Sequence, residues 1–166
     1  MAATAFALAI YTGFVFYSWG MFGGAPRLQN ELFTAIWNND TNTVIRLIEK
    51  GADPNGPSTM LSRSTPLIDA AHFGNSGIVR LLLKKGADPN RTDRFGHAAL
   101  YQALTSPFSQ ETDSIQYSSE IITNLLAHGA SISGKDVMSA VSNIDAGDPR
   151  IQFFQDALNK KSHKSP

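Results

Sequence analysis

Two identical pentapeptides, Gly-Ala-Asp-Pro-Asn, start 35 residues apart in this chain and constrain its fold more than any other feature. They occupy residues 51–55 and 86–90, and the residues before them match as well, with Leu47 corresponding to Leu82. A period of this length is typical of small units that stack side by side, because one such unit cannot bury its own apolar face. The sequence therefore predicts a solenoid of repeated units.

The central unit indicates how one repeat folds. Its apolar spacing predicts helices over residues 67–73 and 76–84. Pro66 suits the first turn of a helix, where its missing N–H costs nothing. Gly74 is expected to end the first helix, and Gly86 to end the second in a left-handed conformation. The second helix then has one broad apolar face, made of Ile78, Val79, Leu81, Leu82 and Leu83.

The hexapeptide Thr-Pro-Leu-Ile-Asp-Ala at residues 65–70 resembles the T-P-L-H-x-A signature of the ankyrin repeat family, with Ile68 in place of the usual histidine. The resemblance covers about residues 30–158. It implies an all-α repeat solenoid in which each unit is a helix-turn-helix with a β-hairpin finger. Ten extra residues in the third unit predict a polar loop over residues 105–117. The expected units are residues 30–63, 64–95, 96–133 and 134–158.

Residues 1–24 contain no charged side chain, and their number suits a helix that crosses a bilayer. We expect an uncleaved membrane anchor there, followed by a linker over residues 25–29. A cleavable signal peptide is an alternative, although no basic residue precedes the apolar stretch. A soluble capping helix is another, although the stretch is apolar on all sides. The basic residues 159–166 are expected to form a disordered tail.

Composition and motifs point away from catalysis. Basic and acidic residues are equal, 14 each, so no basic domain for nucleic acid is expected. The absence of cysteine excludes thiol chemistry. Residues 129–135 match G-x-x-x-x-G-K, but Asp136 stands where a phosphate-binding loop needs Ser or Thr. The histidines lack metal-ligand spacing. We expect no enzymatic activity, no metal, no cofactor and no small-molecule substrate.

The resemblance implies that partner proteins bind the concave face made by the fingers and first helices. Exposed aromatic and methionine side chains near arginine are typical of the centre of an interface. The alternative is that some of these side chains only cover neighbouring helices. Carried over by position, the expected partner-binding residues are Trp37, Met60, Leu61, His72, Phe73, Arg94, Phe95 and His97.

These features predict a non-enzymatic protein-binding module that is tethered to a membrane or exported. The chain is similar to small exported bacterial ankyrin proteins. That similarity implies a periplasmic or extracytoplasmic immunity protein that neutralises a secreted toxic enzyme. The alternative is an ankyrin scaffold that faces the cytoplasm and recruits a protein complex to the membrane. The charges that follow the apolar segment do not decide between these two orientations, because the positive charge of Arg27 and the negative charge of Glu31 nearly cancel.

Overall fold

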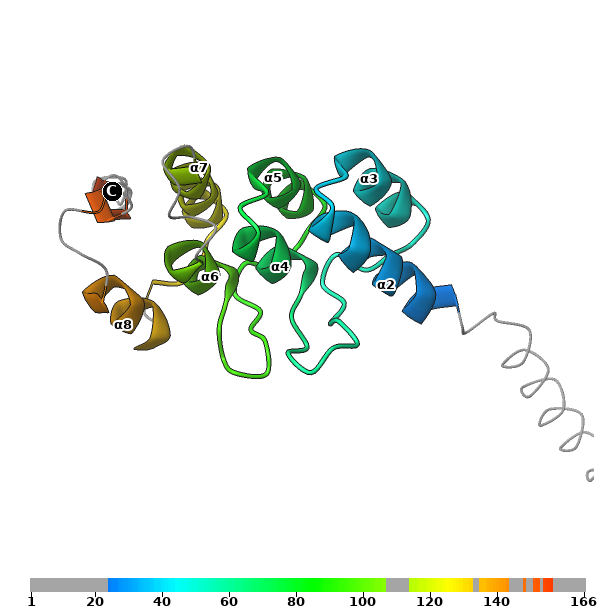
Figure 1. Cartoon of the computed structure of the whole chain (residues 1–166), viewed down its shortest axis with the longest axis horizontal. Helices are drawn as coiled ribbons and strands as arrows, with labels where there is room; N and C mark the ends of the chain where they lie inside the picture. The colour runs from blue at the N-terminus through cyan, green and yellow to red at the C-terminus, as the bar shows by residue number, and fades with distance from the viewer. Residues whose placement is uncertain are drawn as a thin grey trace, which may run out of the picture.

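The computed structural model describes residues 24–106, 114–132, 135–143, 148, 151–152 and 154–156. Its helices lie in two rows (Figure 1). The predicted all-α repeat solenoid is confirmed for these residues. One row holds the first helix of each unit, α2 (Gly24–Trp37), α4 (Pro66–His72), α6 (Ala99–Thr105) and α8 (Lys135–Asn143). The other row holds the second helices, α3 (Thr41–Glu49), α5 (Ser76–Lys84) and α7 (Ser114–Ala127).

The central unit folds as its sequence predicts. The Thr65 hydroxyl accepts a hydrogen bond from the Ile68 N–H at 3.3 Å and caps α4, whose first residue is Pro66. Gly74 and Gly86 follow α4 and α5 with φ angles of 73° and 86°, which favour glycine. The buried side chains of α5 are Ile78, Val79, Leu82 and Leu83.

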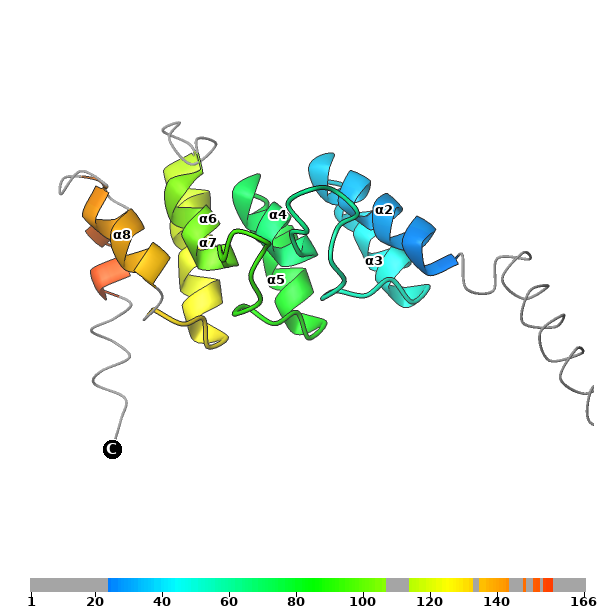
Figure 2. The ribbon, with the colours of Figure 1, turned by 90° about the horizontal axis from the view of Figure 1, so that it is seen from below.

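One continuous hydrophobic core fills the space between the two rows. Figure 2 shows the pairs α2 with α3, α4 with α5 and α6 with α7 stacked along the long axis. Each pair buries its apolar face against the next pair, so the core is shared between units. The largest fully buried side chains are Leu32, Ile36, Leu67, Ile78, Leu82, Leu100, Leu104, Ile121, Ile122 and Leu125.

The repeated pentapeptide joins one unit to the next by hydrogen bonds. Asp53 accepts a hydrogen bond from the Asn55 N–H at 2.8 Å, which shapes the turn. The Asn55 side chain then donates to the Gly86 carbonyl at 2.9 Å and accepts from the Asp88 N–H at 2.8 Å. Each pentapeptide therefore connects two units as well as ending a helix.

Asn90 repeats this arrangement one unit further along. Its side chain donates to the Gly129 carbonyl at 3.1 Å and accepts from the Ser131 N–H at 2.7 Å. Asn90 also begins a glycosylation-like Asn-Arg-Thr sequence. Because both sides of its amide are engaged by the backbone, the structure gives this residue a structural role.

The predicted linker over residues 25–29 is wrong, because these residues lie in α2. Pro26 stands in the first turn of that helix, where a missing N–H is tolerated. The first repeat therefore begins before residue 30.

This longer helix carries a buried polar residue, Gln29. Its side chain accepts from the Asp53 N–H at 3.2 Å, and it donates to the carbonyls of Asp53 at 3.1 Å and Gly56 at 3.0 Å. Gln29 thus makes to Asp53 the contact that Asn55 makes to Asp88 in the next unit.

The fingers contain no β-strand within the described residues. We define the first finger as residues 56–65 and the second as residues 91–98. The first finger is closed by a hydrogen bond from the Ser58 N–H to the Ser64 carbonyl at 2.8 Å. The second contains one isolated antiparallel bridge between Thr92 and Ala98. The predicted β-hairpins are therefore ordered loops, which Figure 1 shows below the row of first helices.

The insertion in the third unit is shorter as a loop than predicted. Thr105 belongs to α6 and residues 114–117 belong to α7, although all were expected in the loop, and residues 107–113 lie outside the described part. The last unit continues after α8 with helical residues 151–152 and 154–156, where Ile151 and Phe154 are buried.

Among the described residues, no helix is long and apolar enough to cross a membrane. The predicted anchor lies outside these residues except for Gly24, and so does the predicted tail.

Candidate protein-binding groove

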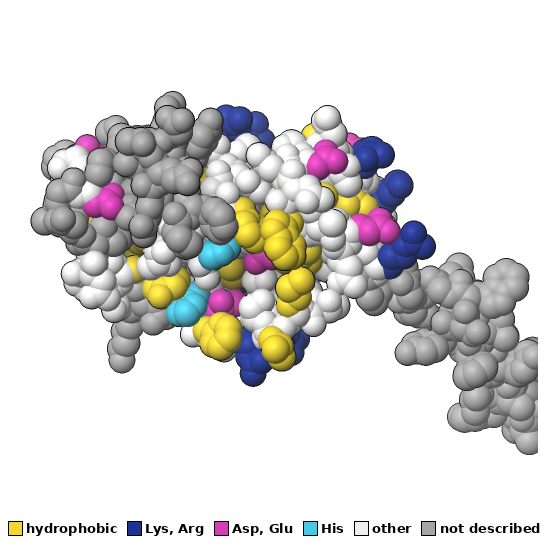
Figure 3. Space-filling model, viewed as in Figure 1, with side chains coloured by type: hydrophobic (Ala, Val, Ile, Leu, Met, Phe, Trp, Pro, Cys, Tyr) yellow, Lys and Arg dark blue, Asp and Glu magenta, His cyan; other side chains and the backbone are white. Residues whose placement is uncertain are grey.

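A groove of about 430 Å³ opens between the fingers and the first helices, and we call it the finger groove. Figure 3 shows this face, on which hydrophobic side chains border a hollow beside acidic side chains and histidine. The groove is lined by Asn30, Phe33, Thr34, Trp37, Ser58, Thr59, Met60, Ser62, Ser64, Ile68, Asp69, His72, Phe73, Asp93 and Gln102.

Equivalent positions of successive first helices line the groove. With the offset of 35 residues, Thr34 and Trp37 of α2 correspond to Asp69 and His72 of α4. Gln102 occupies the position of Asp69 on α6, 33 residues further along. Residues three apart share one face of a helix, so α2 and α4 each present these two positions to the groove, and α6 presents one of them, Gln102. The repeat itself therefore builds the groove.

Aromatic side chains form one wall. The rings of Trp37 and Phe73 stack with centroids 5.8 Å apart and planes at 15°. Phe73 also meets His72 edge to face at 5.1 Å. Trp37 nevertheless keeps 63% of its surface exposed, and Met60 keeps 60%. The wall is therefore packed on one side and open to a partner on the other.

Asp69 forms the polar floor. Burial raises the pKa of this carboxyl above its usual value, and the nearby Asp93 carboxylate raises it further. A hydrogen bond with Ser64 and the charge interaction with His72 oppose this shift without cancelling it. The floor is thus a partly desolvated acid beside a second acid.

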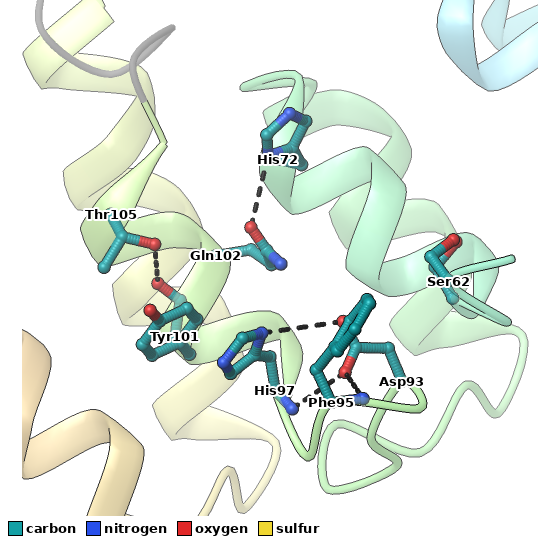
Figure 4. Close-up of polar contacts among 9 residues, drawn as sticks. Ser62, His72, Asp93, Phe95, His97, Tyr101, Gln102 and Thr105 are labelled. Atoms are coloured by element: carbon teal, nitrogen blue, oxygen red, sulfur yellow. Dashed lines mark hydrogen bonds and ion pairs between the residues drawn. The ribbon is translucent and has the colours of Figure 1, made fainter.

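His72 is held between two repeats. Its Nδ1 and the Oε1 of Gln102 form a hydrogen bond of 3.1 Å (Figure 4). The Ser106 hydroxyl donates to the His72 backbone carbonyl. These contacts tie the end of α4 to α6 and hold the groove's edge in place.

Asp93 shapes the second finger. Its carboxylate accepts hydrogen bonds from the backbone N–H groups of Phe95 at 2.8 Å and His97 at 2.9 Å. The His97 Nδ1 lies 3.7 Å from the same carboxylate (Figure 4), and the His97 ring stacks on Tyr101 at 4.1 Å. His97 is therefore packed into the base of the finger.

The remaining predicted residues lie on the finger tips. The Arg94 guanidinium donates to the Leu61 carbonyl at 3.0 Å, and the Arg94 N–H donates to the Ser62 carbonyl at 2.9 Å. The guanidinium carbon also lies 5.7 Å from the centre of the Phe95 ring. Arg94 therefore joins the two fingers. Leu61 is 83% exposed and Phe95 is 64% exposed.

The structure divides the eight predicted residues into two neighbouring groups. Trp37, Met60, His72 and Phe73 line the finger groove. The other four do not line it. Leu61, Arg94 and Phe95 form what we call the finger-tip patch, and His97 lies at the base of the second finger.

Sequence reasoning missed the polar residues of the groove, above all Asp69 and Gln102. The available signal was the repeat register, because Thr34, Asp69 and Gln102 are polar at one equivalent position of the first helices. In the described part of the chain, no three His, Asp or Glu side chains are placed to hold a metal ion.

Comparison with known proteins identifies the class. Residues 32–136, more than half of the chain, match the family model described as Ankyrin repeats (3 copies). The chain therefore belongs to the ankyrin repeat family, whose members are typically non-catalytic modules that bind other proteins.

Among curated proteins, the chain is similar to the 2-5A-dependent ribonuclease of Mus musculus, with 40% identity over 68 residues. The match covers 41% of this chain and 9% of that protein, so this chain spans only a small part of its relative.

Proposed function

We propose that the finger groove and the finger-tip patch together form the surface through which this ankyrin module binds a partner protein. The observation that carries this proposal is the distribution of exposed apolar side chains. Of the large hydrophobic side chains exposed in the described residues, Trp37, Met60, Leu61 and Phe95 lie on this face, and only Met138 lies on α8. Such gathering on one face is typical of an interaction site.

The contacts between the fingers support the same surface. Arg94 hydrogen-bonds two carbonyls of the first finger, Leu61 and Ser62, so the two tips are held at a fixed spacing. A surface that is ordered before binding loses less conformational entropy when the partner arrives.

Binding is tested with the full chain as bait against secreted proteins, with wild type, Phe73→Ala and Phe95→Ala compared for each captured partner. We expect each substitution to weaken binding at least about tenfold, as loss of a central aromatic contact does. Lys84→Ala, at the end of α5 in the other row, is the control and should bind as wild type does. A partner that binds all four proteins equally would contradict the proposal.

We further propose that the module is tethered to a membrane or exported, and that its partner is a secreted toxic enzyme whose active site this face covers. The stretch of residues 1–24, which carries no charged side chain, supports this proposal. A cytoplasm-facing scaffold that recruits a complex to the membrane is the alternative, because the same apolar segment serves both orientations.

Reporters fused after Pro166 distinguish the two. One reporter should be active only outside the cytoplasm and the other fluorescent only inside it. The outside reporter should be active if the chain neutralises an exported enzyme. A signal from the inside reporter alone would contradict that role and favour the scaffold.

A further inference from the structure

We propose that the finger groove receives one long basic side chain, arginine or lysine, from the partner protein. Its aliphatic stem would lie against Trp37 and Phe73, and its charged group would reach Asp69. This inference rests on the proposed function, because it names the chemistry by which that surface recognises its partner.

The wall of the groove suits the stem of such a side chain. Trp37, Phe73 and Met60 provide apolar surface beside the groove. The rings of Trp37 and Phe73 are stacked on each other. Aromatic faces also attract cations, and an arginine guanidinium can stack on them as well. The groove's volume of about 430 Å³ is ample for one extended side chain.

The floor of the groove suits the charged end. Among the described residues, no lysine or arginine forms an ion pair with Asp69. Asp93 adds a second carboxylate to the groove lining, and its ion-pair partner is a histidine, His97. Arg94, which follows Asp93 in the second finger, directs its guanidinium to the Leu61 carbonyl instead. The groove therefore holds acidic charge that lacks a permanent cationic partner.

Burial of Asp69 makes this charge selective. Asp69 is partly buried in the lining of the groove, so its ionised form is poorly solvated there, and this burial raises its pKa. An incoming cation relieves that penalty and gains a charge-assisted hydrogen bond. A purely apolar side chain would desolvate the carboxylate further without adding a hydrogen bond or a charge to offset the cost, and an acidic side chain would be repelled. A long basic side chain can pack its stem against the aromatic wall and place its charge beside Asp69.

The test titrates the ¹⁵N-labelled full chain with Nα-acetyl-arginine amide and, separately, with Nα-acetyl-lysine amide. The matched control probe is Nα-acetyl-citrulline amide, which has nearly the shape of arginine without the charge. We expect the basic probes to shift the backbone signals of Ser62 and Asp69 and the indole N–H of Trp37. The citrulline probe should bind at least about fivefold more weakly, because it lacks the charge that Asp69 attracts.

Asp69→Asn should reduce the affinity for the basic probes to that of the citrulline probe. Glu49→Gln, a matched change at an exposed carboxylate at the end of α3, should leave the affinity unchanged. Equal binding of arginine and citrulline probes, or unchanged binding by Asp69→Asn, would overturn the inference.

The two proposals fail in different ways. A partner that needs Phe95 but binds the Asp69→Asn variant with the same affinity as wild type would overturn only the proposal of a basic side chain. A partner that is indifferent to Phe73 and Phe95 would overturn the binding surface itself.

Discussion

Trp37 and Phe73 stack across the boundary between the first and second repeats, with ring centroids 5.8 Å apart and planes at 15°. Trp37 is the last residue of α2, and Phe73 caps the end of α4. The pair therefore belongs to the packing of two units and, at the same time, to the wall of the finger groove. If the proposed groove binds a partner, stability and recognition depend on the same two rings.

A double-mutant cycle measures the strength of this pair. Trp37→Ala and Phe73→Ala should each lower the free energy of unfolding, and the interaction energy between them should be about 0.5–1.5 kcal/mol. Urea unfolding of wild type, both single variants and the double variant supplies the four values. Phe95→Ala, on an exposed finger tip, is the control and should change stability by less than about 0.5 kcal/mol. Additive effects of the two substitutions would show that the rings do not stabilise each other.

Asp69→Asn should make the protein more stable at neutral pH. Because burial raises the pKa of Asp69 above 3.8, the folded chain binds more protons than the unfolded chain as pH rises above that value. The free energy of unfolding of wild type therefore falls as pH rises through the raised pKa. The variant lacks this penalty, so its advantage should be present at neutral pH and shrink as pH falls toward 3.8.

Urea unfolding of wild type and Asp69→Asn at several pH values between these limits tests this expectation. A variant that is less stable than wild type at neutral pH would mean that the charged form is favoured in the fold.

Gln29→Ala should cost about 2 kcal/mol, because it removes three hydrogen bonds to the backbone of Asp53 and Gly56 at a buried site. Thermal unfolding measures the loss. Glu31→Ala on the same helix removes only an exposed ion pair with Arg27 and should cost less than about 1 kcal/mol. Equal losses in the two variants would refute a special role for Gln29.

Gly56→Ala tests the same contact from the other side. A Cβ atom at this position would lie 2.9 Å from the Gln29 amide, so the hydrogen-bonded side chain would have to move. We expect a loss of stability in wild type and a smaller loss in the Gln29→Ala background. An equal loss in both backgrounds would point to the backbone of Gly56 and not to its contact with Gln29.

Asn55→Ala and Asn90→Ala should destabilise the stack by similar amounts, about 1–2 kcal/mol each. Each variant loses two hydrogen bonds to the neighbouring unit. Equilibrium unfolding checks the values, and Asn38→Ala, at an exposed position after α2, serves as the control. A much smaller effect at Asn90 would contradict its structural role.

The sequence predicted the parts of the fold that depend on local signals. The helices of the central unit follow from Pro66, Gly74 and Gly86, and the stacking of similar units follows from the repeated pentapeptide. The start of α2 could not be predicted in this way. Gly24 and Pro26 are residues typical of a linker, so the local sequence predicts one. The helix instead depends on distant contacts, because Gln29 bonds backbone groups 24 and 27 residues further along the chain.

Of the residues that line the groove, the sequence pointed to the aromatic and methionine side chains and to His72, but not to Asp69 or Gln102. Trp37, Met60 and Phe73 stand out as large side chains at the surface positions of ankyrin repeats. Asp69 does not stand out, because its pattern is that of an ordinary polar residue on a helix and its burial comes from the fingers. The contact of Arg94 with Leu61 depends on the path of the first finger. In this finger Arg63 adopts a positive φ of 49°, which cannot be predicted from the sequence because this conformation usually belongs to glycine.

Gln29 also affects how copies of this chain meet. In the register of this stack, a further unit would place its asparagine against the N–H of Asp53 and the carbonyl of Gly51, and that unit could belong to another molecule. Gln29 already occupies the Asp53 N–H from within the same chain. At this end, head-to-tail growth of the solenoid into a filament would therefore lack one of the two hydrogen bonds that join successive units.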